Sequence, residues 1–255
     1  MSREHPIRDA LLATSLLTLV PTGARWPDGE ATQTAAWFPA VGAIFGLVGY
    51  AIVKVARIAH LPSRPALVIA VLIVGVWALL SRLLHWDGLA DVADGFWGGH
   101  DPAARLEIMS DSRTGAFGAT TVALVAIAEV AAIGAILARP HELPVLLVPV
   151  IARFSATAAS WLGSPARPGG LGRSVVARPT TLSLVIAVVP LAAVIGAMWL
   201  AFHVAGLALG VFGLLVAFAV PHLIASRFGG VTGDVMGASV LLTEAILFIA
   251  FALVV

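Results

Sequence analysis

The chain has no cysteine, a single lysine among its 255 residues and few charged residues of any kind. The absence of cysteine excludes disulfides, thiolate metal sites and thiol nucleophiles. Charged residues make up 11% of the chain and the formal net charge is +1, so the composition gives no indication of a nucleic-acid partner. The sequence G-x-x-x-x-G-K-[ST] does not occur, which excludes a P-loop.

Hydrophobic sequence is what the chain has in abundance. Hydrophobic residues make up 60% of it and the mean hydropathy is +1.00, which excludes an ordinary soluble domain. The apolar runs are continuous rather than alternating, so they predict helices and not a β-barrel. We expect an all-α, polytopic membrane bundle that forms one domain over residues 1–255, with about seven transmembrane helices at roughly 36–59, 65–84, 115–138, 143–163, 181–203, 205–226 and 235–255. Residues 6–20 are too short to span and predict an interfacial or half-inserted helix.

The arginines predict the orientation of the bundle. With seven spans and Arg153 left out, ten arginines fall on the side of the N-terminus and four basic residues fall on the other side. Because positively charged loops stay in the cytoplasm, we expect the N-terminus there. Three polar, glycine-rich segments share this side: residues 83–118, 163–179 and 226–238. Their position predicts a single site that faces the cytoplasm.

The first of these segments concentrates carboxylates. Asp87, Asp91 and Asp94 stand at positions i, i+4 and i+7, so a helix would place them on one stripe. Three like charges on a stripe repel each other and favour a bound cation. Oxygen ligands without histidine or cysteine ligands nearby favour Mg²⁺, Ca²⁺ or Mn²⁺ over zinc. The plainer alternative is a solvated acidic loop beside a membrane helix, and the helical spacing and the glycines favour the metal site.

The other two segments combine glycine with arginine. Gly170 lies between Arg167 and Arg173, and the glycine run of the third segment ends at Asp234. Glycine lets backbone amides approach an anion, and arginine binds phosphate through two parallel hydrogen bonds. Each loop alone is a weak signal, because glycine-rich joints between membrane helices are common. Their position opposite an acidic cluster predicts that they bind phosphate.

Asp111 has two interpretations. Asp101 followed by Pro102 predicts the start of a helix, which would place Glu107 and Asp111 one turn apart. In the structural interpretation, nearby arginines such as Arg113 neutralise this pair. In the functional interpretation, Asp111 contacts the metal or the substrate.

Three charges fall inside predicted spans: Glu129, Arg153 and Glu244. A charge at mid-bilayer costs at least a few kcal/mol, so each should face the bundle interior with a partner. Arg153 can pair with either glutamate or line the floor of the site, and the sequence favours neither role. His85 falls on the helix face opposite the carboxylates, where we expect an interfacial residue rather than a ligand.

Clustered aspartates, a divalent cation, glycine-rich loops and arginines together predict phosphoryl transfer, in which catalysis rests on positioning and electrostatics. The sequence also resembles the cobalamin synthases, the adenosylcobinamide-GDP ribazoletransferases. "HWDGLADVADGFWGG" followed by "RLEIMSDSRTGAFG" looks like the signature of that family, and "LTLVP", "WFPAVGAIFGLVGY", "GLGR" and "GGVTGDVMGA" resemble its other blocks in the same order. The resemblance covers nearly the whole chain. It departs mildly at Trp86, where an aliphatic residue is expected, and in "LTLVP", which lacks the arginine that often precedes its proline.

The resemblance implies a Mg²⁺-dependent enzyme of the bacterial cytoplasmic (inner) membrane. It would join adenosylcobinamide-GDP to α-ribazole or its 5′-phosphate, release GMP and so complete the assembly of adenosylcobalamin. On this hypothesis the catalytic residues and metal ligands are Asp87, Asp91 and Asp94, with Asp234 completing the metal site. The substrate-binding residues would be Asp111, Arg113, Arg153, Arg167, Gly170 and Arg173. Membrane lipid is the expected surrounding, nucleic acid is not an expected partner, and a homo-oligomer stays open.

Two alternative functions compete with this one. A CDP-alcohol phosphotransferase also carries aspartates on a membrane helix and releases CMP, but its D-G-x-x-A-R pattern differs from "DGLAD" here. A cation transporter would use Glu129, Arg153 and Glu244, yet transporters place their acidic residues at the midplane on broken helices. Most acidic residues of this chain lie in border loops instead.

Overall fold

The computed structural model describes residues 5–27, 32–59, 65–111, 113–139 and 141–255. Within these ranges the chain is helical and forms no strand beyond one isolated bridge. The elements are α1 (Pro6–Leu17), the short 3-10 helix η1 (Thr34–Trp37), α2 (Phe38–Ile58), α3 (Ala66–Leu80), α4 (Leu84–Gly98), α5 (Pro102–Ile108), α6 (Ala116–Ala138), α7 (Leu143–Leu162), α8 (Leu171–Val175), α9 (Thr181–Phe228) and α10 (Gly233–Val254).

Five helices in the described part of the chain are long and apolar enough to cross a membrane: α2 together with η1, α6, α7, α9 and α10. The 48-residue α9 reverses at His203, whose φ of 50° and ψ of −128° are not helical. Gly206 lets the two arms pack after this reversal, because a Cβ there would lie 2.0 Å from the carbonyl oxygen of Met198. The arms correspond to the predicted spans 181–203 and 205–226, and the prediction of a polytopic helical membrane protein is confirmed.

The predicted span 65–84 ends earlier than expected, because the chain turns sharply after α3. Arg82 and Leu83 both have left-handed backbone angles, with φ of 53° and 62°. The amide of Leu83 donates to the carbonyl of Ala78 at 2.8 Å and the amide of Arg82 donates to that of Leu79 at 2.9 Å, which is the pattern of a Schellman helix stop. Helix α4 then starts at 89° to α3. It is not by itself one of the helices that could cross a membrane.

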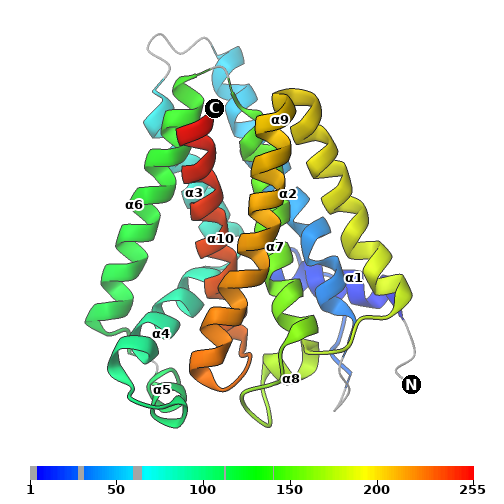
Figure 1. Ribbon diagram of the computed structural model, residues 1–255, viewed down its shortest axis with the longest axis vertical. Helices are drawn as coiled ribbons and strands as arrows, with labels where there is room; N and C mark the ends of the chain where they lie inside the picture. The colour runs from blue at the N-terminus through cyan, green and yellow to red at the C-terminus, as the bar shows by residue number, and fades with distance from the viewer. Residues whose placement is uncertain (1–4, 28–31, 60–64, 112, 140) are drawn as a thin grey trace.

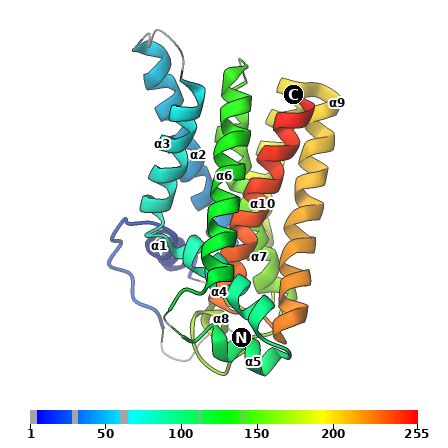
Figure 2. The same ribbon diagram turned by 90° about the vertical axis from the view of Figure 1, so that its left-hand side faces the viewer.

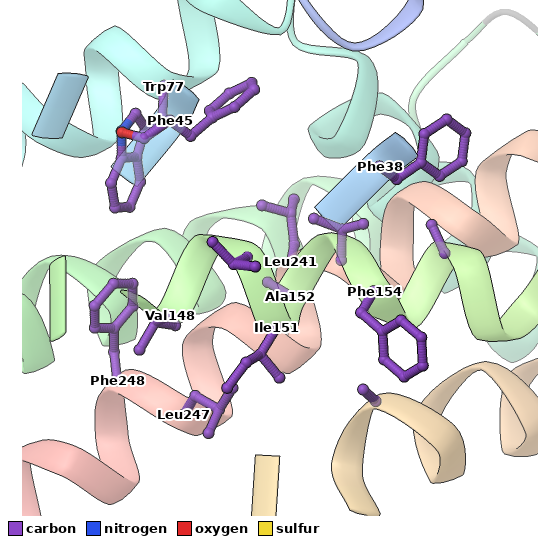
Figure 3. Packing of buried hydrophobic residues seen from close by; sticks show 14 of the residues in the cluster. Phe38, Phe45, Trp77, Val148, Ile151, Ala152, Phe154, Leu241, Leu247 and Phe248 are labelled. Carbon is purple, nitrogen blue, oxygen red and sulfur yellow. The ribbon is translucent and has the colours of Figure 1, made fainter. Parts of the chain in front are cut away.

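The core of the bundle is built around α7, which packs against α2, α9 and α10. Phenylalanines of α2 and aliphatic residues of α7 and α10 interlock there (Figure 3). Gly42 and Gly46 allow the close approach of α2 to α7, since a Cβ at these positions would lie 2.5 and 2.1 Å from carbonyl oxygens of α7. The indole of Trp77 donates to the carbonyl of Phe45 at 2.7 Å and fastens α3 to α2.

The two ends of the bundle differ in character. Helices α4, α5 and α8 and the turn from α9 to α10 gather at one end, which we call the polar end (Figures 1 and 2). The C-terminus and the reversal of α9 lie at the opposite end. Helix α1 lies across the bundle near the polar end, as an interfacial helix would (Figure 1). The three glycine-rich segments that were predicted to share one face therefore meet at the polar end.

Candidate active site at the polar end

The three aspartates of α4 lie on one stripe, as their spacing predicted. Asp87 is exposed, and Asp91 and Asp94 are half-buried. Asp87 lies in the first turn of α4, where a negative charge interacts favourably with the amides of the helix start. Leu89 and Val92 of α4 lie outside this stripe and are buried in the bundle interior.

Asp234 of α10 lies directly against this stripe. Thr232 caps α10 by accepting a hydrogen bond from the amide of Val235 at 3.1 Å, which places Asp234 in the first turn. A Cβ at Gly88 would lie 2.9 Å from both the Cα and the carbonyl oxygen of Asp234. Gly88 therefore lets α10 approach α4 closely, a role that the sequence did not indicate.

The negative charges of the α4 and α10 carboxylates act on one another. Burial is the main cause that raises the pKa of Asp91 to about 7. The negative charges of Asp234, Asp87 and Asp94 add to this effect, and the positive charge of Arg167 opposes it. Among the described residues, no three histidine or acidic side chains converge closely enough to hold a metal ion by themselves. A cation at this surface would thus need further oxygen atoms from a substrate or from water.

Both carboxylate oxygens of Asp94 accept backbone hydrogen bonds, which the sequence did not predict. Its Oδ2 accepts a hydrogen bond from the amide of Gly115 at 2.7 Å, and its Oδ1 accepts one from the amide of Gly118 at 2.8 Å. A Cβ at either glycine would lie 2.4–2.5 Å from the Asp94 carboxylate. Asp94 therefore caps α6, whose own N-cap residue Gly115 has no side chain to do so. The two glycines of "RTGAFG" are the sequence feature that could have indicated this contact.

The loop between α7 and α8 is fastened to the turn between α9 and α10. The amide of Val231 donates to the carbonyl of Ser164 at 2.8 Å, and the amide of Ala166 donates to the carbonyl of Val231 at 3.0 Å. The guanidinium of Arg167 donates to the carbonyl of Leu106 at 2.5 Å, while its charge acts on Asp91. The structure thus brings the predicted arginine loop to the carboxylates through Arg167.

Gly170 and Arg173, which follow Arg167 in this segment, are open to solvent. Gly170 has a φ of 85°, which only glycine adopts without strain, and it is exposed. Arg173 lies in the short α8 and is also exposed. Their predicted contact with phosphate stays a prediction.

Asp111 and Arg113 form an ion pair with each other. The Nη2 of Arg113 lies 2.6 Å from Oδ2 of Asp111 and its Nε lies 3.0 Å from Oδ1. This contact lowers the pKa of Asp111 to about 2. The expectation that Glu107 and Asp111 share a helix was wrong, because α5 ends at Ile108. The predicted cap of α5 is confirmed, since Asp101 accepts from the amide of Ala104 at 2.9 Å.

Arg153 is buried inside the bundle and pairs with Glu244, which confirms the structural role that the sequence offered for it. Its guanidinium also lies over the ring of Phe45, at 4.1 Å from the centroid. Glu244 lies ten residues beyond Asp234 in α10, or about 15 Å along the helix axis. The structure therefore separates Arg153 from the open loops. His85 is buried beside it, so the expectation of an interfacial histidine was wrong.

The chain is similar to known proteins over nearly its whole length. A family model described as cobalamin-5-phosphate synthase matches residues 9–252. The adenosylcobinamide-GDP ribazoletransferase of Syntrophobacter fumaroxidans is 40% identical over 253 residues, which cover 94% of this chain and 91% of the relative. Proteins of the same name from Pseudomonas aeruginosa PAO1 and Prosthecochloris aestuarii are 36% and 34% identical, cover 97% and 93% of this chain, and are themselves covered over 98% and 95% of their length. No solved structure matches the chain.

Proposed function

The chain belongs to the cobalamin-5-phosphate synthase family, and we propose that it acts as an adenosylcobinamide-GDP ribazoletransferase. The acceptor would be α-ribazole or its 5′-phosphate, and GMP would be released. One observation of the structure supports this chemistry above all: Asp91, Asp234 and Arg167, from three separate segments, lie close enough for their charges to act on each other at one end of a membrane bundle. Opposite charges arranged in this way suit the transfer of a substituted phosphate.

The proposed reaction exchanges one phosphorus–oxygen bond for another. A hydroxyl oxygen of the ribazole forms a bond to the phosphorus that carries the cobinamide. The bond from this phosphorus to the bridging oxygen of the pyrophosphate breaks, and GMP leaves with that oxygen. One aspartate of the site accepts the hydroxyl proton. Arg167 and Arg173 would bind the phosphate oxygens of the departing GMP, because a guanidinium matches a phosphate through two hydrogen bonds.

The carboxylates fit a magnesium ion that is shared with the substrate. Mg²⁺ in proteins usually takes one or two carboxylates, with water and substrate phosphates as its other ligands. One or two carboxylates from among Asp87, Asp91 and Asp234 would hold it, because both oxygens of Asp94 already accept amide hydrogen bonds. When bound, the ion would supply charge neutralisation on the pyrophosphate. The pKa of Asp91 is raised mainly by burial and further by its negatively charged neighbours, and a cation would relieve the second of these effects.

We also propose that the polar end faces the cytoplasm of a bacterial cell. The excess of arginines on that side supports this orientation. Because the chain has no cysteine, a cysteine at the exposed Ser226 should react with a membrane-impermeant thiol reagent only in inverted membranes. A cysteine at the exposed Ala59 should react only in intact cells without their outer membrane. The reverse pattern would contradict the orientation.

The activity can be tested directly with purified protein in detergent. Adenosylcobinamide-GDP, α-ribazole and Mg²⁺ are supplied, and GMP release is measured together with formation of the joined product. We expect release that depends on both substrates, stops on chelation of Mg²⁺ and returns when the ion is added back. A parallel reaction with a CDP-alcohol donor measures CMP. Release of CMP, or of neither nucleotide, would contradict the proposal.

A further inference from the structure

Four polar side chains from four helices meet inside the bundle. His85 of α4 is 3% exposed, and Glu129 of α6, Arg153 of α7 and Glu244 of α10 are each 1% exposed. We call these four residues the buried cluster. Arg153 forms an ion pair with Glu244. Glu244 lies about 15 Å beyond Asp234 along the axis of α10, so the ion pair lies deeper in the bundle than Asp234.

Three atoms of the buried cluster have no hydrogen-bond partner among the described residues: Nε2 of His85, Oε2 of Glu129 and Nε of Arg153. A buried polar atom without a partner costs about 1–3 kcal/mol, so such atoms are rare in folded proteins. All three residues line one cavity of about 10 Å³. This volume is about the least in which one water molecule fits.

The donor and acceptor types of the three atoms match those of a single water molecule. The Nε–H of Arg153 can donate to its oxygen. The water can then donate one hydrogen to Oε2 of Glu129 and the other to Nε2 of a neutral His85. Buried waters typically make about three hydrogen bonds of this kind. A polar cavity with this arrangement therefore has the features of a site built for one water.

His85 is also the residue through which the buried cluster can affect the rotation of α4. The stop at Arg82 and Leu83 interrupts the helical hydrogen bonds between α3 and α4, so the rotation of α4 depends on its packing against neighbouring helices, which include α6 and α10. His85 lies two residues before Asp87, on the opposite face of the helix. A rotation of α4 by about 20° would move a carboxylate at a radius of roughly 5–6 Å by about 2 Å. A displacement of 1 Å in an active site can cost about 100-fold in rate.

We propose that the cavity holds one water molecule that links His85 to Glu129 and Arg153, and that this link makes His85 a positioning residue for the aspartates of α4. The consequence for catalysis rests on the proposed function. The water site and the position of α4 do not, because both can be measured without turnover.

The test uses the full chain in detergent and a pair of variants. His85→Phe keeps an aromatic ring, a slightly larger one, and removes both ring nitrogens, whereas His85→Gln keeps a polar side chain near the same place. Spin labels at Trp97→Cys on α4 and Ser226→Cys on α9, both exposed, report the position of α4 through their distance distribution. We expect His85→Phe to shift or broaden this distribution and to lower kcat for GMP release on the order of 10- to 100-fold. His85→Gln should restore both.

A second partner of the water provides an independent check. Glu129→Leu removes the acceptor on α6, and it should change the label distances as His85→Phe does. The double variant should lose no more activity than either single variant, because two residues that act through one water are not additive. An unchanged distance distribution in His85→Phe, equal losses in the phenylalanine and glutamine variants, or additive losses would overturn the proposal. If His85→Phe does not fold, the Glu129→Leu distances decide. If the unmodified chain releases no GMP, the proposed function fails and the distances alone test the positioning role.

Discussion

Gly88→Ala tests how closely α4 and α10 must approach. A Cβ at this position would lie 2.9 Å from the Cα and from the carbonyl oxygen of Asp234. Both atoms belong to the backbone and cannot rotate away. Ordinary carbon contacts lie at about 3.5–4.0 Å, so the two helices must separate by roughly 0.5–1 Å. Asp234 would then move away from the stripe of α4 by a similar distance.

The expected effect on stability is small, because two terms oppose each other. Overpacking a close contact costs typically 1–3 kcal/mol. Replacing glycine by alanine in a helix interior returns about 1 kcal/mol. The net destabilisation should therefore be about 0–2 kcal/mol. The effect on turnover should be much larger, because a shift of 1 Å between groups that act together costs about 100-fold.

Two other glycines serve as controls. Gly75 in α3 and Gly196 in α9 are helical, and a Cβ at either position meets nothing within 4 Å. Alanine there should leave GMP release unchanged and raise the melting temperature slightly. Steady-state GMP release and thermal unfolding in detergent measure both effects for all three variants. If Gly88→Ala kept the activity of the two controls, the contact between α4 and α10 would not position the site.

Three further predictions separate the roles of the charged residues. Asp87→Asn should abolish Mg²⁺-dependent GMP release and leave the melting temperature equal or higher, since the relieved repulsion on the stripe offsets the lost interaction with the start of α4; a near-normal rate at saturating Mg²⁺ would exclude Asp87 as a ligand. Asp94→Asn should lower the melting temperature by about 2–4 °C, because one amide acceptor of the α6 cap is lost at a cost of about 1 kcal/mol; an unchanged melting temperature would argue against the cap. Arg173→Lys should lower kcat/KM by roughly 10- to 150-fold if its guanidinium binds the guanylyl phosphate in bidentate fashion, and unchanged kinetics would remove it from the site.

The periodicity and hydropathy of the sequence predicted the helical bundle and the gathering of three segments at one end, because both depend on local composition. Spacing also predicted the stripe of Asp87, Asp91 and Asp94. It did not distinguish Asp94 from the other two, since the amides of Gly115 and Gly118 that bind it come from a different helix. No local pattern reports which carboxylate already has partners.

The sequence also did not predict the role of Gly88 or the burial of His85. In sequence, the glycines of residues 83–118 were only an indication of a metal site. In the structure Gly88 lies inside α4, and its role depends on Asp234, which is 146 positions later in the chain. His85 was misplaced for a similar reason: helical spacing gave the face on which it lies, but only the packing of α6, α7 and α10 makes that face a buried one.

The turn between α3 and α4 explains why the aspartates can work together with α10. A straight continuation of α3 would carry Asp94, fourteen residues beyond Leu80, about 21 Å further along the axis of α3. The bend of 89° instead keeps the stripe level with the starts of α6 and α10, where Gly118 and Asp234 meet it. Two left-handed residues cost roughly 1–2 kcal/mol each, and the hydrogen bonds of the helix stop offset part of this. Because this cost is of the same order as one or two good hydrogen bonds, the cap of α6 by Asp94 and the packing of Gly88 against Asp234 are large enough to contribute to holding the turn.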